Sequence, residues 1–334
     1  MTDALTSRPL SRRRMLTILA GAGAALLPGA AWAGGPRRFE WQGTALGANA
    51  RMILYHRDAA AAEAAVKAAI AEVERLEAEF SLYRADSQLC RLNRSGTIEA
   101  PSHDMRRLLA LCRRFGDLSG GAFDVTVQPL WRLYADHFAA RPESAAGPDA
   151  DAVARARSLV DYRRIRMTPA RVSLAPGMAV TLNGIAQGYI TDRVTDLLRR
   201  RGWSNVLVNL GETRALDGRA DGGPWSVALA GALDGNGMPM TIPLVNRAVA
   251  TSAGDGTRFE ATGRHHHIFD PARGESSRYH GQVSVVADDA TTADALSTAL
   301  YVMAPGDALG LLRRFAGAEA WLTGPDGRIR RLTG

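Results

Sequence analysis

The sequence predicts an α+β fold in which mixed, largely antiparallel sheets are flanked by helices in a single compact domain. An alanine-rich stretch over residues 59–80 carries apolar residues at helical spacing, whereas the chain after residue 205 consists of short apolar runs separated by glycine-rich turns. Successive strands with such short connections pair as antiparallel neighbours. The 334 residues can bury a substantial core, and hydrophobic and charged contents of 46% and 22% are ordinary for a globular protein.

The first 33 residues have the features of an export signal, so the folded domain is expected to be residues 34–334. The pair Arg12-Arg13 precedes an apolar run over residues 16–27, and the segment ends in Ala31-Trp32-Ala33, a small-x-small cleavage pattern. The run is shorter than the roughly 20 apolar residues that cross a bilayer. We therefore expect a twin-arginine signal peptide, cleaved after about Ala33, and a periplasmic mature protein. An uncleaved membrane anchor is the alternative.

The charge of the mature chain does not indicate nucleic-acid binding. The whole sequence carries a formal charge of +7, and the signal segment holds four arginines against one aspartate, which leaves about +4. The one dense basic run, Arg199-Arg200-Arg201, ends a helical pattern, where cations favour the helix dipole. Cys90 and Cys112 match no metal motif. An oxidising compartment permits a disulfide between them, and spacing alone does not decide whether they pair.

The first half of the mature chain predicts a hairpin followed by helices. A glycine-bounded bend over residues 42–48 separates two strand-like runs, and polar residues that can cap helices precede several later segments. Asp124 either caps the last of these helices or faces a ligand together with Tyr83. Residues 139–150, rich in Ala, Pro and Gly, form a surface connection. We expect strands between residues 39 and 55, and helices over 59–80, from Asp86 or Ser87 to 93, over 102–119 and over 127–138.

A glycine-bearing turn within residues 181–192 is the most informative stretch. It follows a short apolar strand pattern and leads into residues 193–198, where apolar residues recur at helical spacing. Unpaired N–H groups and the positive dipole end of such a helix attract anionic oxygens, and Gly184 and Gly188 let a bulky ligand approach the backbone. An ordinary strand-to-helix turn is the alternative.

Beyond this helix the chain predicts further strands and a histidine cluster. If the histidine stretch is a strand, His265 and His267 lie on one face and His266 on the other. This alternation, with no fourth soft ligand nearby, disfavours a shared zinc site. One imidazole acting as a general base near neutral pH fits better. The expected elements are strands over residues 206–210, 225–229, 240–244 and 248–251, a helix over 307–315 and a hairpin turning at 325–327.

A carboxylate and a hydroxyl lie one helical turn apart near the C-terminus. A strand over residues 283–287 ends in two aspartates, and Thr291 or Thr292 is expected to cap the helix that follows. Asp294 and Thr298, at positions i and i+4, share one face of that helix and suit a hard cation such as Mg²⁺, which prefers oxygen ligands. Alternatively, Asp294 completes a capping box with Thr291.

Together these segments resemble the ApbE family, the bacterial FAD:protein FMN transferases, in the right order over nearly all of the mature chain. One such match would mean little, whereas eight in order are specific. The resemblance implies the ApbE-like fold with a central FAD cleft. The segments that carry it are residues 43–47, 83–87, 122–126, 182–192, 209–211, 250–252, 267–271 with Gly274, and 293–296 with Thr298.

The resemblance also implies a reaction. FAD would lie in the cleft with its pyrophosphate bridged by Mg²⁺, and the FMN half would pass to a Thr or Ser hydroxyl of a partner flavoprotein, releasing AMP. Phosphoryl transfer depends mainly on positioning and on neutralising charge, which agrees with these residue types. By position in the family motifs, His267 would accept the hydroxyl proton, and Asp294, Thr298 and the backbone carbonyl of Gly184 would hold the metal. The implied FAD-binding residues are Leu46, Tyr83, Ala122, Phe123, Asp124, Thr181, Gln187 and Ile268.

The chain departs from the family pattern at several positions. Thr181 stands where an acid is usual, and Gln187 stands where Lys or Glu is often found, which affects how the adenine or ribose is held. Leu46 replaces a usual Met, and Glu212 follows a single glycine, Gly211, instead of a pair.

Two other functions are compatible with the same residues. Attack by water would make the protein an FAD pyrophosphatase that yields FMN and AMP. The substitutions at Thr181 and Gln187 are also compatible with a non-catalytic FAD-binding maturation or carrier protein. The form of residues 183–189 resembles the NosX-like branch that accompanies nitrous oxide reduction, which implies a membrane flavoprotein of nitrous oxide respiration as the acceptor.

Overall fold

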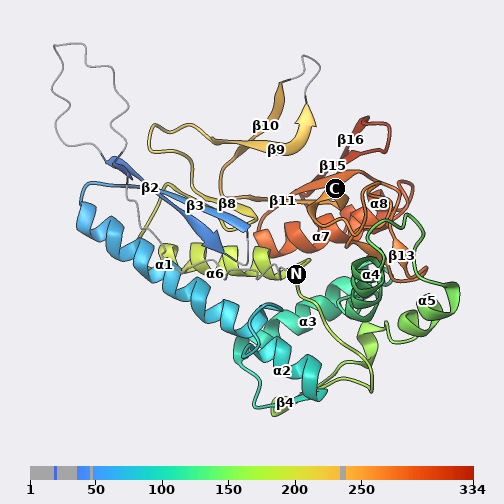
Figure 1. The fold of residues 1–334 in the computed structure, drawn as a ribbon. Helices are drawn as coiled ribbons and strands as arrows, with labels where there is room; N and C mark the ends of the chain where they lie inside the picture. Colours follow the sequence, from blue (N-terminus) through green and yellow to red (C-terminus); the bar gives the residue numbers. More distant parts are fainter. Residues whose placement is uncertain (1–18, 21–35, 46–47, 234–237) are drawn as a thin grey trace, which may run out of the picture.

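The fold is built on a nine-stranded sheet in which all neighbouring strands are antiparallel (Figure 1). The computed structural model describes residues 19–20, 36–45, 48–233 and 238–334. Leu46 and nearly all of the expected signal peptide lie outside the described residues. In spatial order the strands are β1 (Leu19–Ala20), β2 (Arg37–Ala45), β3 (Ala48–His56), β7 (Val206–Asn209), β8 (Thr213–Leu216), β11 (Ala248–Ala253), β14 (Gln282–Ala287), β15 (Glu319–Thr323) and β16 (Ile329–Thr333).

Eight helices and three small sheets surround this sheet in the described part of the chain. The helices are α1 (Ala59–Phe80), α2 (Gln88–Ser95), α3 (His103–Leu118), α4 (Gln128–Ala140), α5 (Ala150–Arg157), α6 (Ala186–Arg200), α7 (Ala290–Val302) and α8 (Ala308–Leu312). The small sheets pair β9 (Trp225–Leu233) with β10 (Pro239–Leu244), β12 (Phe269–Asp270) with β13 (Glu275–Ser276), and β4 (Thr97–Glu99) with β6 (Arg171–Ser173) and β5 (Arg166–Met167).

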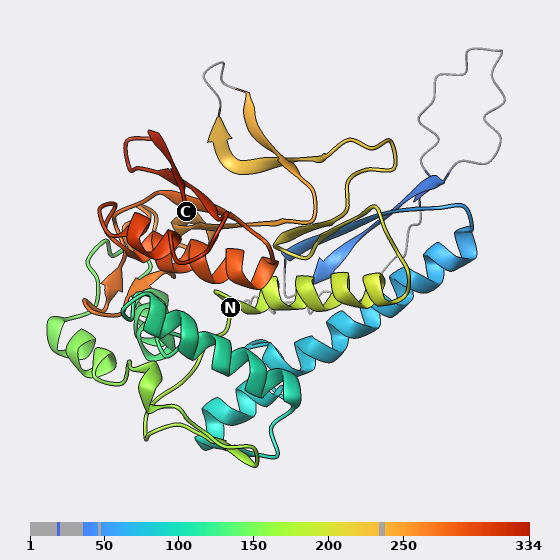
Figure 2. The ribbon, with the colours of Figure 1, turned by 180° about the vertical axis from the view of Figure 1, so that it is seen from behind.

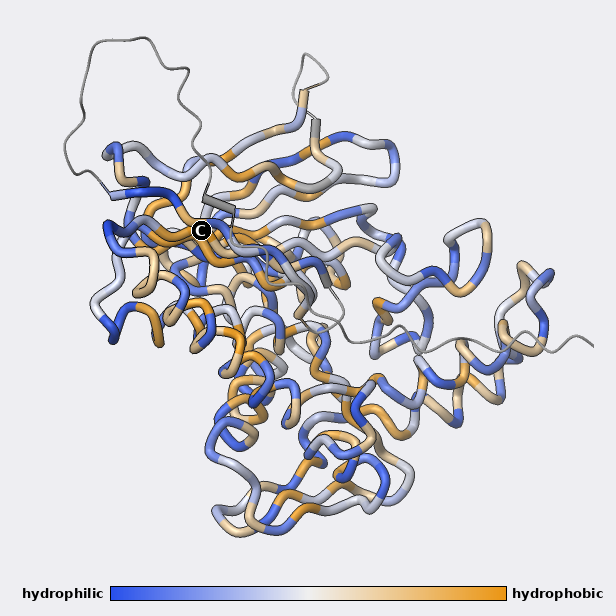
Figure 3. The backbone as a smooth tube through the Cα atoms, turned by 60° about the vertical axis from the view of Figure 1, so that its left-hand side comes forward, coloured by the Kyte–Doolittle hydropathy of each residue, from blue (hydrophilic) through white to orange (hydrophobic). Residues whose placement is uncertain are grey.

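The elements form layers. Helices α1, α6 and α7 cover one face of the large sheet, the β9–β10 hairpin lies over the other, and α2, α3 and α4 lie beyond the helical layer (Figures 1 and 2). The main hydrophobic core lies between the sheet and the helices, and a second cluster around Trp225 and Leu229 fills the space under the hairpin. Hydrophobic segments concentrate accordingly where sheet and helices meet (Figure 3). The expected α+β fold is therefore confirmed.

Several expected elements are confirmed closely. Helix α1 spans the predicted residues, because its alanine-rich apolar stripe is long and unambiguous. Ser87, one of the two proposed caps, accepts a hydrogen bond from the Cys90 backbone N–H at the start of α2. Ser102 accepts one from the Met105 backbone N–H at the start of α3. Cys90 and Cys112 are both free thiols. Among the described residues, no helix combines the length and apolar character needed to cross a membrane.

The expected cap of α7 is wrong, and of the two alternatives for Asp124 the helix cap does not form. The N-cap of α7 is Asp289, whose side chain accepts from the Thr292 backbone N–H, instead of Thr291 or Thr292. The Thr291 hydroxyl instead donates to Asp192 of α6. Helix α4 begins after Val127 with no side-chain cap, because the Asp124 carboxylate is occupied elsewhere.

The histidine stretch is not the predicted strand. Residues 265–267 form only an isolated antiparallel bridge with the loop before them, centred on Arg258 and His266: the His267 N–H donates to the Thr257 carbonyl, and the Phe259 N–H donates to the His265 carbonyl. As a result, the three imidazoles have different surroundings. His266 is buried against Ser277 and Tyr301, while His265 and His267 line two separate cavities.

Helices α6 and α7 pack very closely, which fixes the geometry of the cleft described below. Asp192 of α6 accepts from the backbone N–H groups of Ala290 and Thr291 at 2.9 and 2.8 Å, so it caps the start of α7 from outside. A Cβ added to Gly188 would lie 2.2 Å from the Ala290 carbonyl oxygen. Only glycine fits there.

We expect Gly188→Ala to destabilise the protein by about 1–3 kcal/mol or more, because the added methyl group meets backbone that cannot yield without moving α7. Urea unfolding measures this change. Gly310→Ala is the matched control, since a Cβ there meets nothing within 4 Å and should be neutral or stabilise by about 0.5–1 kcal/mol. Equal stability of the two variants would contradict the close α6–α7 contact.

Candidate active site

One cavity of about 460 Å³ lies where α6, α7, β11, the loop before α4 and the loop around His267 meet. It combines stretches far apart in the sequence, as the expected site requires. Ten of the twelve predicted site residues line it: Ala122, Phe123, Asp124, Thr181, Gly184, Gln187, His267, Ile268, Asp294 and Thr298. We call it the central cavity.

The glycine turn and the acid–hydroxyl pair converge at the base of this cavity. The Gly188 backbone N–H donates to Asp294 Oδ2 at 2.9 Å, and a Cβ added to Gly184 would lie 2.9 Å from Thr298 Oγ1. Asp294 therefore does not form the capping box with Thr291 that was the alternative. Helix α6 starts without a side-chain cap, which leaves the positive end of its dipole directed at Asp294 and Thr298.

Two buried carboxylates, Asp294 and Glu212, interact electrostatically here. Burial raises the pKa of Asp294 to about 7, an effect that the Gly188 N–H opposes and the charge of Asp192 reinforces. Burial, together with the charge of Asp294, also raises the pKa of Glu212 well above its usual value. Glu212 has only a long hydrogen bond, 3.3 Å, from the Thr251 N–H. Buried acids whose pKa values are raised in this way mark a candidate functional site.

The residues around Asp124 form the opposite wall. The Thr181 N–H donates to the Val125 carbonyl at 2.8 Å, which ties the two expected FAD-binding segments together. Asp124 accepts from the Thr126 N–H and hydroxyl and from the Tyr162 N–H. Burial is the main cause of its raised pKa. Trp131 adds an aromatic surface to this wall.

His267 lies at the side of the cavity with one nitrogen available. Its Nδ1 is 3.2 Å from the Thr257 carbonyl oxygen, which can only accept, so the proton of a neutral ring resides on Nδ1. The Nε2 lone pair is then unused. Burial lowers the pKa of His267, although the Thr257 carbonyl opposes the shift, so the ring is neutral at pH 7. This is the state that a general base needs.

The two remaining predicted residues do not line the central cavity. Tyr83 is 78% exposed and lines an adjoining cavity, which shares Trp131 and Asn183 with the central one. Leu46 lies outside the described residues.

The sequence did not mark Glu212, Ser252 or Trp131 as site residues. Ser252 of β11 hydrogen-bonds to Thr298 Oγ1 of α7 at 3.2 Å, and the charge of Asp294 in α7 acts on Glu212, which lies in the turn between β7 and β8. Such contacts between segments far apart in the sequence leave no local spacing signal. Gln187, by contrast, packs over Gly211, where φ is +106° and a Cβ would lie 2.4 Å from Gln187 Nε2.

The oxygen donors present fit Mg²⁺. Asp294, Thr298 and the Gly184 carbonyl offer hard oxygen atoms, and Asp294 is a buried acid with few hydrogen-bond donors. Mg²⁺ in proteins is commonly held by one or two carboxylates plus substrate phosphates. Four acids line the central cavity, Asp124, Glu212, Asp255 and Asp294, and its described lining residues include no Lys or Arg. A diphosphate would need a cation to enter it.

Comparison with known proteins agrees with this site. A model of the ApbE family matches residues 46–322. The FAD:protein FMN transferase of Treponema pallidum is 33% identical over 301 residues, covering 83% of this chain and 82% of that one. The FAD:protein FMN transferase of Haemophilus influenzae is 31% identical over 245 residues, covering 70% and 71%.

Solved structures agree as well. The crystal structure of the Pseudomonas stutzeri flavinyl transferase ApbE superposes with a TM-score of 0.76 at 27% identity, covering 90% of this chain and 94% of that one. The ApbE protein of Thermotoga maritima superposes with a TM-score of 0.78 at 28% identity, covering 88% and 97%. The family model alone spans most of the described sequence. This chain therefore belongs to the ApbE family.

Proposed function

We propose that this protein is an Mg²⁺-dependent FAD:protein FMN transferase, which moves FMN from FAD to a Thr or Ser hydroxyl of a partner flavoprotein and releases AMP. The observation that carries the proposal is the central cavity, where the α6 N-terminus, four acids and a neutral histidine converge without a cationic side chain among the described lining residues. Its relatives' activity as FAD:protein FMN transferases supports the reaction class.

In this proposal each group has a separate role. Phe123, Ile268 and Trp131 offer apolar surface to the flavin or adenine ring, and Asp124 and Gln187 supply polar contacts at its edges. Asp294, Thr298 and the Gly184 carbonyl hold the metal, which neutralises diphosphate charge when bound. The N–H groups at the start of α6 stabilise phosphoryl oxygens.

His267 then completes the transfer. Its Nε2 accepts the proton of the acceptor hydroxyl as the oxygen forms a bond to the FMN phosphorus, and the bond from that phosphorus to the AMP oxygen breaks. The products are the FMN phosphoester of the acceptor and AMP. The burial that keeps the ring neutral makes this proton transfer possible near pH 7.

The test is to incubate the purified protein with FAD, Mg²⁺ and a flavoprotein domain bearing a candidate Thr. We expect a mass increase equal to one FMN residue on the acceptor and equimolar AMP. The control is the same domain with that Thr changed to Val, which should stay unmodified. AMP release without any acceptor would instead indicate an FAD pyrophosphatase, and tightly bound FAD with neither product would indicate a carrier.

We also propose that the reaction takes place in the periplasm, after export by the twin-arginine route and cleavage near Ala33. The form of residues 183–189 supports a membrane flavoprotein of nitrous oxide respiration as the acceptor. Sequencing the N-terminus of the exported protein checks the cleavage, and replacing Arg12-Arg13 with lysines should retain it in the cytoplasm.

A further inference from the structure

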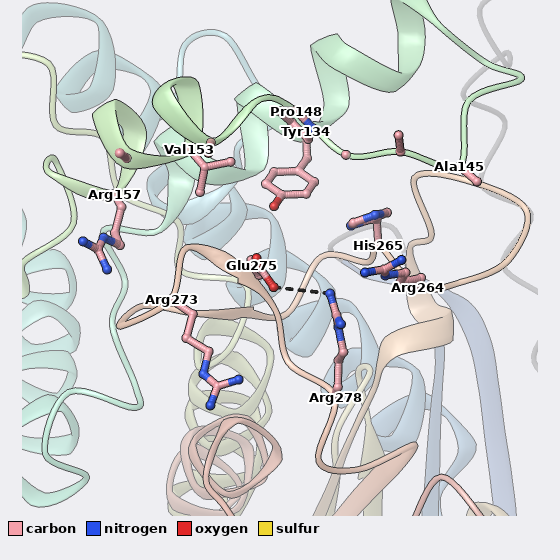
Figure 4. Close-up of a pocket in the computed structure, with 14 residues that line it drawn as sticks. Tyr134, Ala145, Pro148, Val153, Arg157, Arg264, His265, Arg273, Glu275 and Arg278 are labelled. Carbon is pink, nitrogen blue, oxygen red and sulfur yellow. Dashed lines mark hydrogen bonds and ion pairs between the residues drawn. The ribbon is translucent and has the colours of Figure 1, made fainter.

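Besides the central cavity, the structure has a second cavity of about 530 Å³ (Figure 4). The two share no lining residue, and the irregular histidine segment runs between them: His265 lines the second cavity and His267 the central one. The walls of the second cavity come from α4, the loop before α5, α5 itself and the β12–β13 turn with the residues after it. We call it the arginine cavity because Arg157, Arg264, Arg273 and Arg278 line it.

Positive charge is in excess here. Glu275 is the only acid among the described lining residues, and it pairs with Arg278 at 3.3 Å. Arg273 is 3.6 Å from Asp270. Arg157 donates to the Ala272 carbonyl, which leaves its charge unneutralised. The Arg264 side chain has neither a hydrogen bond nor an ion pair within the part of the chain that the structure describes.

A buried imidazole without a partner lines the same cavity. His265 is only 6% exposed, and its Nδ1 is fully buried with no hydrogen-bond partner among the described residues. The ring lies against Gly147, whose Cβ position would be 3.1 Å from His265 Cε1. Buried polar atoms are nearly always satisfied, so this unpartnered nitrogen, which lies beneath the cavity surface without reaching it, is an exception in the described part of the chain.

Tyr134 provides a further donor. Its ring is buried, and in Figure 4 its hydroxyl points into the space that Glu275 and Arg278 face. Burial and the charge of Glu275 raise its pKa to about 12, so the group stays a hydroxyl. No described residue hydrogen-bonds to it. Guanidinium, imidazole and phenol donors therefore surround one space.

We propose that the arginine cavity binds a small organic phosphate. Guanidinium forks match phosphate oxygens in pairs, and the Tyr134 ring with Val153, Pro148 and Ala150 supplies an apolar wall for the organic part. The volume falls within the range of about 300–1,000 Å³ that is typical of small-molecule sites. Arg264 and the Tyr134 hydroxyl contact the phosphate, and His265 lies beneath it.

The test uses phenyl phosphate as the probe and isothermal titration calorimetry as the measurement, with the purified protein saturated with FAD and Mg²⁺ so that the central cavity is occupied. We expect one binding site. Arg264→Gln should weaken binding about tenfold or more, the usual effect of losing a charged hydrogen bond. Tyr134→Phe, which removes a single hydroxyl, should weaken it about threefold to tenfold.

Arg328→Gln is the matched control, because it removes the same charge from a side chain that is 91% exposed and outside the cavity. The affinity of Arg328→Gln for phenyl phosphate should equal that of the wild type. Absence of a binding site, or equal losses in Arg264→Gln and Arg328→Gln, would overturn the proposal. Benzoate binding as tightly as phenyl phosphate would overturn the phosphate assignment, as would tighter binding of a hexaglutamate peptide. Because FMN transfer is not measured, these outcomes do not depend on the proposed function.

Discussion

Asp294→Asn is expected to reduce FMN transfer about 10³-fold or more, since groups that neutralise charge in phosphoryl transfer have effects of this size. The amide keeps the shape of the side chain and can still accept from the Gly188 N–H, so the α6–α7 contact survives. What is lost is the Asp294 carboxylate, which lines the cavity together with Thr298 and Gly184. The measurement is the initial rate of acceptor flavinylation across a Mg²⁺ titration, in which the residual activity should no longer respond to Mg²⁺.

Asp289→Asn is the matched control for this variant. It makes the same charge change on the same helix, outside the central cavity, and Asn serves as well as Asp at an N-cap. Its activity and Mg²⁺ response should equal those of the wild type. A normal Mg²⁺ response in Asp294→Asn would show that the metal binds elsewhere.

Thermal unfolding separates this loss of activity from a loss of fold. Burial raises the pKa of Asp294 to about 7 from an ordinary value of 3.8, so the native state holds a proton that the unfolded chain releases. The stability that this group contributes is therefore present at low pH and declines as pH rises from about 4 through about 7. The Asp294→Asn variant lacks this decline in stability, because an amide does not titrate in this pH range. Without Mg²⁺ at pH 8, the variant should melt at or above the temperature of the wild type.

The sequence anticipated those parts of the fold and site that local patterns determine. Helix α1 could be placed because a long apolar stripe leaves no competing interpretation, and Gly184 could be singled out because glycine before a helix has a physical role. The positions of Asp294 and Thr298 followed from helical spacing. The expectation that these two residues lie beside Gly184 rested on the family resemblance, because no local sequence pattern predicts that α6 packs against α7.

The errors have a common cause in contacts between distant segments. Thr291 is a reasonable cap by local rules, yet its hydroxyl donates to Asp192, 99 positions earlier in the chain, and Asp289 caps the helix instead. The histidine stretch alternates like a strand but finds no partner strand, since the loop before it supplies the hydrogen bonds. Glu212 becomes a site residue because the fold buries it where the charge of Asp294, 82 positions later in the chain, acts on it.

His267→Ala is expected to slow FMN transfer about 10²–10⁴-fold, the usual contribution of general-base catalysis, while FAD binds with unchanged affinity. The reason is geometric: the Thr257 carbonyl holds the Nδ1 proton, so only Nε2 can receive the proton of the acceptor hydroxyl. Single-turnover flavinylation measures the rate, and quenching of flavin fluorescence measures FAD affinity. His103→Ala, at an exposed position that starts α3, is the control and should behave as wild type.

The pH dependence and chemical rescue decide whether His267 acts as a base or only shapes the cavity. Because burial lowers its pKa below 6.5, the wild-type rate at saturating Mg²⁺ should rise with pH through a value under 6.5 and then level off. His267→Gly should lose this rise, and added imidazole should restore part of the rate by taking the empty position beside Gly256. If FAD affinity falls as much as the rate does, or if imidazole restores nothing, His267 positions the dinucleotide and the proton leaves by another route.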